Sequence, residues 1–263
     1  MKSYLAFVKG YMTTFIVYRA GFIFTFIGNC VYMGLIYFLW KNIYSGAATL
    51  HGMSFNHVFV YLSLAGSLFV LFKTFAGWNI SKKIIDGSII MDLIKPLDFQ
   101  LQTLFGAIGV ALSSLITVTL PSVLVLFLVF GGSLNGGIGL FFFPIGLSFA
   151  FLISFALDYV VGLISFYTHS LWGINMTKEV VVSLFSGALV PLQYYPEALR
   201  AVVKYLPFQA IYHVPLTLAT SPGLTPVDCL SLLFVQLCWV LILFTASRLF
   251  FRVAVRVLMV SGG

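Results

Sequence analysis

The chain has 263 residues, of which 61% are hydrophobic and only 8% are Asp, Glu, Lys or Arg. Soluble domains carry about 25% charged residues, so this composition excludes a water-soluble fold and predicts an all-α integral membrane protein. The net charge of +7 does not indicate nucleic-acid binding, because the basic residues are scattered singly between apolar segments.

The first 19 residues form an amphipathic segment. Lys2, Lys9 and Thr13 fall on one face, while the apolar residues recur at helical spacing on another: Leu5, Val8, Met12 and Phe15. This pattern is typical of a helix that lies in the membrane interface, which we expect over residues 1–19 on the inner leaflet. No small-residue cleavage site follows a short apolar core, so we do not expect this segment to be removed as a signal peptide.

Six apolar segments are predicted to cross the membrane, because a span needs about 20 residues at 1.5 Å per residue. They cover residues 20–40, 57–72, 103–130, 140–167, 179–192 and 228–250. Pro121 lies in the third segment and can kink it. The fifth segment supplies only about 14 residues, near 21 Å of helix, so we expect it to need the following stretch to reach the far side.

Residues 193–220 are interrupted by spaced prolines. Pro196, Pro207 and Pro215 divide this semi-apolar stretch into pieces that are too short to cross a bilayer. We therefore expect two short extracellular re-entrant or interfacial helices, at about 197–205 and 208–218, before the last span.

The distribution of basic residues predicts the orientation. With an inner N-terminus, three basic side chains lie outside (Lys41, Arg200 and Lys204) and eleven lie inside: Lys2, Lys9, Arg19, Lys73, Lys82, Lys83, Lys95, Lys178, Arg248, Arg252 and Arg256. This positive-inside bias predicts a multi-pass protein of the cell (inner or plasma) membrane with both termini in the cytoplasm.

Residues 79–99 are cytoplasmic by this argument, although isoleucines give them strong apolar faces. Lys82 and Lys83 are close enough to Asp86 for pairing on a helix, and the dipeptide Asp86-Gly87 favours a turn. A loop that is both charged and apolar suggests docking to another protein. The alternative is an interfacial helix that rests on membrane lipid.

Asp158 is the only acidic residue deep in an apolar run. An ionisable group in hydrocarbon costs several kcal/mol unless it faces protein or water, so we expect its side chain to point inward. Two interpretations stay open. Asp158 acts as a gate or substrate contact, or it makes a structural hydrogen bond to a neighbouring helix.

The sequence contains no phosphate-binding GxxxxGK[ST] motif, no GxSxG motif and no HExxH motif. The histidines are not at ligand spacing, and Cys30, Cys229 and Cys238 show no CxxC pattern, so neither a metal site nor a disulfide framework is expected. The chain is not expected to be an enzyme. If ATP drives its activity, a partner must supply the nucleotide site.

Three stretches together resemble the permease subunit of an ATP-binding-cassette (ABC) transporter of the type 2 exporter family. The first is IIDGSIIMDLIKPLDF, in which a glycine turn precedes an apolar helix and the pair Lys95-Pro96. The second is the proline-spaced segment Ser186–Leu216 with its step Leu206-Pro207-Phe208, and the third is the basic tail RVLMVSGG. The resemblance covers nearly the whole chain.

The resemblance implies the membrane-spanning subunit of an ATP-driven exporter, which forms its pathway with a second permease in a homodimer or heterodimer. A cytoplasmic ABC ATPase dimer would bind ATP and Mg, and this chain would hold no cofactor. The cytoplasmic coupling helix would contact the ATPase through Ile85, Asp86, Gly87, Ser88, Ile89, Asp92 and Lys95. The candidate pathway or gate residues are Asp158, Tyr159, Pro191, Tyr194, Tyr195, Pro207 and Phe208. Asp158 is included because of the cost of burying its charge, and the resemblance implies nothing specific about it.

Two other classes of function are weighed against this interpretation. A self-sufficient channel or secondary transporter would carry charged or polar residues along several spans, whereas here Asp158 is the one plausible deep charge. A membrane enzyme that acts on lipids would need clustered His, Asp or Glu near one interface, and the sequence has no such cluster.

The sequence does not select a substrate. An aromatic-rich interior would suit amphipathic drugs, peptides or lipids equally well.

Overall fold

The computed structural model describes residues 2–17, 19–134, 137–168 and 171–257. Within these ranges the chain is mostly helical, and a short antiparallel hairpin pairs Thr49 with Ser54 and Leu50 with Met53. The elements are α1 (Lys2–Val17), α2 (Arg19–Ile43), β1 (Thr49–Leu50), β2 (Met53–Ser54), α3 (Phe55–Phe72), α4 (Ala76–Ile85), α5 (Ile89–Leu93), α6 (Phe99–Ser114), η1 (Leu115–Thr119), α7 (Leu120–Leu128), α8 (Gly139–Leu163), η2 (Ile164–Phe166), α9 (Trp172–Phe185), η3 (Leu192–Tyr194), α10 (Glu197–Val203), η4 (Pro207–Ala210), α11 (His213–Thr220), α12 (Pro226–Ala254) and η5 (Val255–Val257).

Five helical segments of the described chain are long and apolar enough to cross a membrane. They are Ala20–Ile43, Phe55–Ile85, Phe99–Leu128, Gly139–Phe166 and Pro226–Val257. Each overlaps one of the predicted spans, and together they confirm an all-α, multi-pass membrane protein. The predicted span at 179–192 is not among them, because the helix in this region, α9, has 14 residues and is about 21 Å long.

The position of α9 differs from the predicted segment 179–192. The helix starts at Trp172 and ends at Phe185. Gly187 has a φ of +81°, which is incompatible with a continuing right-handed helix, and the chain bends until Pro191. An added Cβ at Gly187 would also lie 2.9 Å from the Tyr61 hydroxyl, so packing against α3 favours glycine at this bend.

The predicted third span contains a local irregularity just before Pro121. Proline has no N–H with which to bond the carbonyl of the preceding turn, and the helix widens into the π-turn η1 over Leu115–Thr119. Pro121 follows η1 directly as the second residue of α7. One apolar segment is therefore built from α6, η1 and α7.

In two helix pairs, glycine residues allow the helix backbones to come into direct contact. A Cβ on Gly77 of α4 would lie 2.8 Å from the Asp158 carbonyl oxygen of α8, and a Cβ on Gly162 would lie 2.9 Å from the Gly77 Cα. In the same way, a Cβ on Gly109 of α6 would lie 2.7 Å from the Val8 carbonyl oxygen of α1. Because only glycine fits such close approaches, α4 is joined firmly to α8 and α1 to α6.

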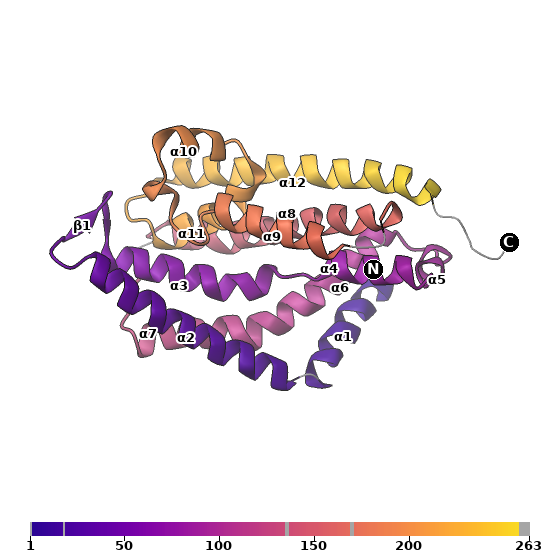
Figure 1. Ribbon diagram of the computed structural model, residues 1–263, viewed down its shortest axis with the longest axis horizontal. Coiled ribbons are helices and arrows are strands. Elements are labelled where there is room, and N and C mark those ends of the chain that lie inside the picture. The colour runs from indigo at the N-terminus through magenta and orange to yellow at the C-terminus, as the bar shows by residue number, and fades with distance from the viewer. Residues whose placement is uncertain (1, 18, 135–136, 169–170, 258–263) are drawn as a thin grey trace.

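The two ends of the bundle carry different elements (Figure 1). The short helix α5, the start of α1 and the end of α12 lie at one end, and the hairpin, α10 and α11 lie at the other. Gln236 of α12 donates hydrogen bonds to the Gly146 carbonyl (3.0 Å) and the Ala210 carbonyl (2.8 Å). These bonds tie the segment between α10 and α11 to the long helices α8 and α12.

Candidate functional site: the loop between α4 and α6

The chain leaves α4 through a three-residue turn, Asp86-Gly87-Ser88, and enters α5. The Asp86 carboxylate accepts hydrogen bonds from the backbone N–H of Ser88 (2.9 Å) and from its hydroxyl (2.6 Å). Gly87 has a φ of +74°, in the left-handed region that favours glycine. The turn that Asp86-Gly87 predicts is thus present, and it is stabilised by an aspartate that bonds its own following backbone.

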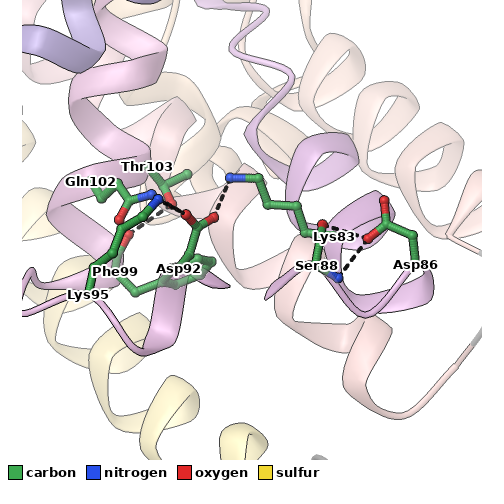
Figure 2. Close-up of polar contacts among 8 residues, drawn as sticks. All are labelled: Lys83, Asp86, Ser88, Asp92, Lys95, Phe99, Gln102 and Thr103. Atoms are coloured by element: carbon green, nitrogen blue, oxygen red, sulfur yellow. Dashed lines mark hydrogen bonds and ion pairs between the residues drawn. The ribbon is translucent and has the colours of Figure 1, made fainter. Parts of the chain in front are cut away.

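Asp92 is the centre of the loop's polar contacts (Figure 2). Its carboxylate accepts from Lys83 Nζ at 2.6 Å, from Lys95 Nζ at 2.7 Å and from Gln102 Nε2 at 2.8 Å. The side chain is only 8% exposed. Burial alone would raise the pKa of Asp92, but the three donors outweigh it and lower the pKa to about 2. Asp92 is therefore a carboxylate at physiological pH, and it links α4, α5 and α6.

The lysine pairing differs from the prediction. The helical spacing suggested pairs of Lys82 and Lys83 with Asp86, whereas Lys83 forms its ion pair with Asp92. Asp86 lies at the C-terminal cap of α4 and uses one carboxylate oxygen for Ser88. The turn folds α5 back toward α4, and this brings a residue nine positions away within reach of Lys83.

The predicted coupling residues divide into exposed and buried groups. Ile85 is 55% exposed, and Asp86, Gly87, Ser88 and Lys95 are also exposed. Ile89 is fully buried and Asp92 lies inward, so these two hold the loop together and do not present a surface. Two residues outside the predicted set extend the exposed apolar surface, namely Met91 at 68% and Ile94 at 73%. Helical spacing could have found them, because Ile89 and Asp92 occupy the opposite face of α5.

Asp158 lies in a second polar cluster, where α8 meets α9. Its carboxylate accepts hydrogen bonds from the Thr74 hydroxyl and from Lys178 Nζ. Lys178 also pairs with Glu179 at 2.9 Å. The side chain of Asp158 is nearly buried and points inward, as its burial cost requires. These contacts are of the kind that the structural interpretation expected, and a role in gating stays a prediction.

The remaining candidate pathway residues lie elsewhere in the bundle. The Tyr194 hydroxyl lies 2.7 Å from the Tyr44 hydroxyl beside the β hairpin, and the Tyr195 hydroxyl donates to the Leu184 carbonyl. Phe208 packs against Phe185. Pro191 immediately precedes the short helical turn η3, and Pro207 is the first residue of η4.

Asp158 and Tyr159 are not brought together with Tyr194. Thr74, the hydrogen-bond partner of Asp158, follows the end of α3, whereas the hairpin precedes its start, about 27 Å away along the 18-residue helix. Tyr159 lies next to Asp158 and packs against Phe99 and Phe155. Tyr194 and Asp158 therefore lie toward opposite ends of α3, whereas Tyr212, four residues after Phe208, packs against Phe72 at the end of α3 near Asp158.

Sequence reasoning missed Thr74 and Lys178 as partners of Asp158. The signal is present in the sequence, since a buried carboxylate favours a nearby cation, and Lys178 is the first lysine or arginine after Asp158. The extension of α9 back to Trp172 places Lys178 on a helix, where its long side chain reaches the carboxylate.

A bundle of long apolar helices, with a charged turn at one end, defines the class of a multi-pass membrane protein. The chain matches the family model described as ABC-2 family transporter protein over residues 30–262. It belongs to that family and is a permease subunit of an ABC transporter, a membrane component that is not itself catalytic. Membership implies association with an ABC ATPase. A search of curated proteins found no match.

Proposed function

We propose that this permease is the membrane subunit of an ATP-driven exporter. It pairs with a second permease, identical or related, and the two enclose the translocation pathway. Two cytoplasmic ATPase subunits, which bind ATP and Mg, dock on the loop between α4 and α6 of each permease. Both termini are cytoplasmic, and α9 with the re-entrant segment of η3, α10, η4 and α11 completes a sixth crossing.

The architecture of the loop is the observation that supports this proposal most strongly. Three donors fix Asp92 from inside, while Ile85, Met91 and Ile94 are left exposed around the turn. An apolar surface that is held in one conformation before binding loses little entropy when a partner docks. A segment that only rested on lipid would not need internal bracing of this kind.

The contact between α4 and α8 connects the loop mechanically to the membrane-spanning helices. Gly77 and Gly162 bring the two backbones together with no intervening side chain, so a displacement of α4 is passed to α8. Asp158 lies at this contact and links α8 to α9 through Lys178. ATP binding by the partner would favour one arrangement of these helices, and hydrolysis would release it.

Site-specific photo-cross-linking tests the docking surface. A benzophenone amino acid at position 91 in native membranes is expected to form an adduct with a nucleotide-binding subunit, identified by mass spectrometry. The matched control is position 141, where Phe141 is 83% exposed on α8 near the opposite end. Adducts with such a subunit from position 141, or with lipid alone from position 91, would contradict the proposal.

The alternative is a self-sufficient channel or secondary transporter. Such a protein is expected to carry charged or polar residues along several spans, whereas Asp158 is the one plausible deep charge, and its carboxylate is already bonded to Lys178 and Thr74. Reconstitution of the purified chain into vesicles separates the two functions. Solute movement without any ATPase would support the alternative, and movement that requires both the ATPase and ATP supports the exporter.

A further inference from the structure

A polar cavity of about 220 Å³ lies beneath the loop, between α1, α4 and α6. Its walls include Phe7 and Tyr11 from α1, Lys83 from α4, and Gln102 from α6. Asp92 and Lys95 close it from the side of the loop. The docking role proposed above leaves this space unexplained, because its lining faces away from the exposed apolar residues.

The cavity is cationic. Two ammonium groups, on Lys83 and Lys95, face the single carboxylate of Asp92. Each ammonium has three N–H donors and uses one of them on Asp92, so both have donors to spare. Their side chains are 33% and 44% exposed, so neither lysine is enclosed by the protein. An anion placed between them would neutralise the remaining positive charge.

Gln102 supplies a second and independent observation that points to a ligand. The residue is only 4% exposed, and its Nε2 donates to Asp92. This bond fixes the orientation of the amide, and the buried Oε1 then has no hydrogen-bond partner in the structure. A buried acceptor without a partner costs about 1–3 kcal/mol, so a ligand with a hydroxyl or ammonium donor would be stabilised here.

An apolar hollow continues from the cavity along α1. It has a volume of about 280 Å³ and is lined by Ala6, Phe7, Gly10 and Tyr11, of which Phe7 and Tyr11 also line the polar cavity. Lys95 Nζ lies 5.8 Å from the centroid of the Phe7 ring, where the two spaces meet. A polar chamber that opens onto an apolar strip fits an amphipathic molecule.

We propose that this cavity binds the headgroup of an anionic glycerophospholipid of the phosphatidylglycerol type. The phosphodiester lies between Lys83 and Lys95, a headgroup hydroxyl donates to Gln102 Oε1, and the acyl chains follow the strip on α1. Because both lysines also hold Asp92, the bound lipid fastens α5 to α1 and α6. The proposed binding does not depend on the transport function.

Lipid retention by the purified full-length chain tests the proposal. The protein is reconstituted in phosphatidylcholine with a minor fraction of phosphatidylglycerol and extracted in detergent, and its bound lipids are quantified by mass spectrometry. We expect enrichment of phosphatidylglycerol, and a loss of about fivefold in Lys95→Gln, which keeps the Lys83–Asp92 pair. Lys95→Arg should retain the lipid.

Two further variants separate the cavity from general effects. Lys9→Gln makes the same charge change on an exposed residue of α1 and should leave retention unchanged. Thr103→Leu fills the cavity without touching the ion pairs and should reduce retention as Lys95→Gln does.

Equal retention of the two lipids, or equal losses in Lys9→Gln and Lys95→Gln, would overturn the proposal. Displacement of the lipid by glycerol 3-phosphate would assign the cavity to a soluble phosphate ester instead.

Discussion

Replacing Asp158 with asparagine should destabilise the protein strongly. The asparagine side chain is isosteric with aspartate and can still accept from Thr74, but it leaves the Lys178 ammonium without its main counter-charge in a largely buried position. Removal of one partner of a buried ion pair costs about 3–5 kcal/mol. We expect about 3 kcal/mol here, because Glu179 remains 2.9 Å from Lys178. The ratio of folded to unfolded protein then falls about a hundredfold.

A double-mutant cycle identifies the cause of the loss. Lys178→Met alone should cost at least as much as Asp158→Asn, since the buried carboxylate would keep only Thr74. The double variant Asp158→Asn/Lys178→Met buries no unpaired charge and should be more stable than either single variant. Reversible unfolding in mixed micelles with increasing dodecyl sulfate measures all three variants. Costs that simply add, or a loss below about 1 kcal/mol in Asp158→Asn, would refute a buried pair at this position.

Three other perturbations follow from the contacts described above. Gly77→Ala should cost about 1–3 kcal/mol in the same unfolding assay, because the new Cβ would lie 2.8 Å from a backbone oxygen. The control Gly28→Ala, where the new Cβ would have no atom within 4 Å, should be neutral or slightly stabilising. Equal effects of the two substitutions would contradict close packing of α4 on α8. Tyr194→Phe removes the hydroxyl that lies 2.7 Å from the Tyr44 hydroxyl and should cost about 1 kcal/mol of stability. Limited proteolysis should then cleave the β hairpin faster, and an unchanged cleavage rate would contradict the contact. Because the pKa of Asp92 is lowered, its contacts stabilise the fold fully above the usual pKa of 3.8, and this stabilisation is lost as pH falls from about 4 to about 2. Melting curves should show an acid-induced loss of stability that is smaller in Asp92→Asn. An equal loss of stability in that variant would count against the contacts.

Local patterns in the sequence were sufficient for much of the fold. The apolar runs lie where five helical segments could cross a membrane, and the dipeptide Asp86-Gly87 forms the turn that its chemistry favours. The prolines within residues 193–220 likewise separate α10 from α11. Each of these features depends on residues a few positions apart, so a single sequence carries enough information to predict it.

Features that depend on distant residues were not predictable. The end of α9 depends on Gly187, whose left-handed backbone and proximity to Tyr61 appear only when α3 lies beside it. The ion pair of Lys83 with Asp92 requires the chain to fold back through the turn. Lys178 reaches Asp158 because α9 starts earlier than hydropathy indicates. In each case a tertiary contact determined the partner, and spacing along the chain did not.

The length of α12 has a consequence for how the protein sits in its bilayer. The helix has 29 residues and is about 44 Å long, whereas the hydrocarbon layer is about 30 Å thick. Accommodating the whole helix by inclination would need about 47°, beyond the range of about 0–40° found for membrane helices. Some of its turns must therefore lie outside the hydrocarbon, and we expect these to be the last ones, because arginine is costly in lipid and Arg248 and Arg252 lie there. Arg248 forms an ion pair with Asp98 at 2.6 Å, which ties this end of α12 to the start of α6.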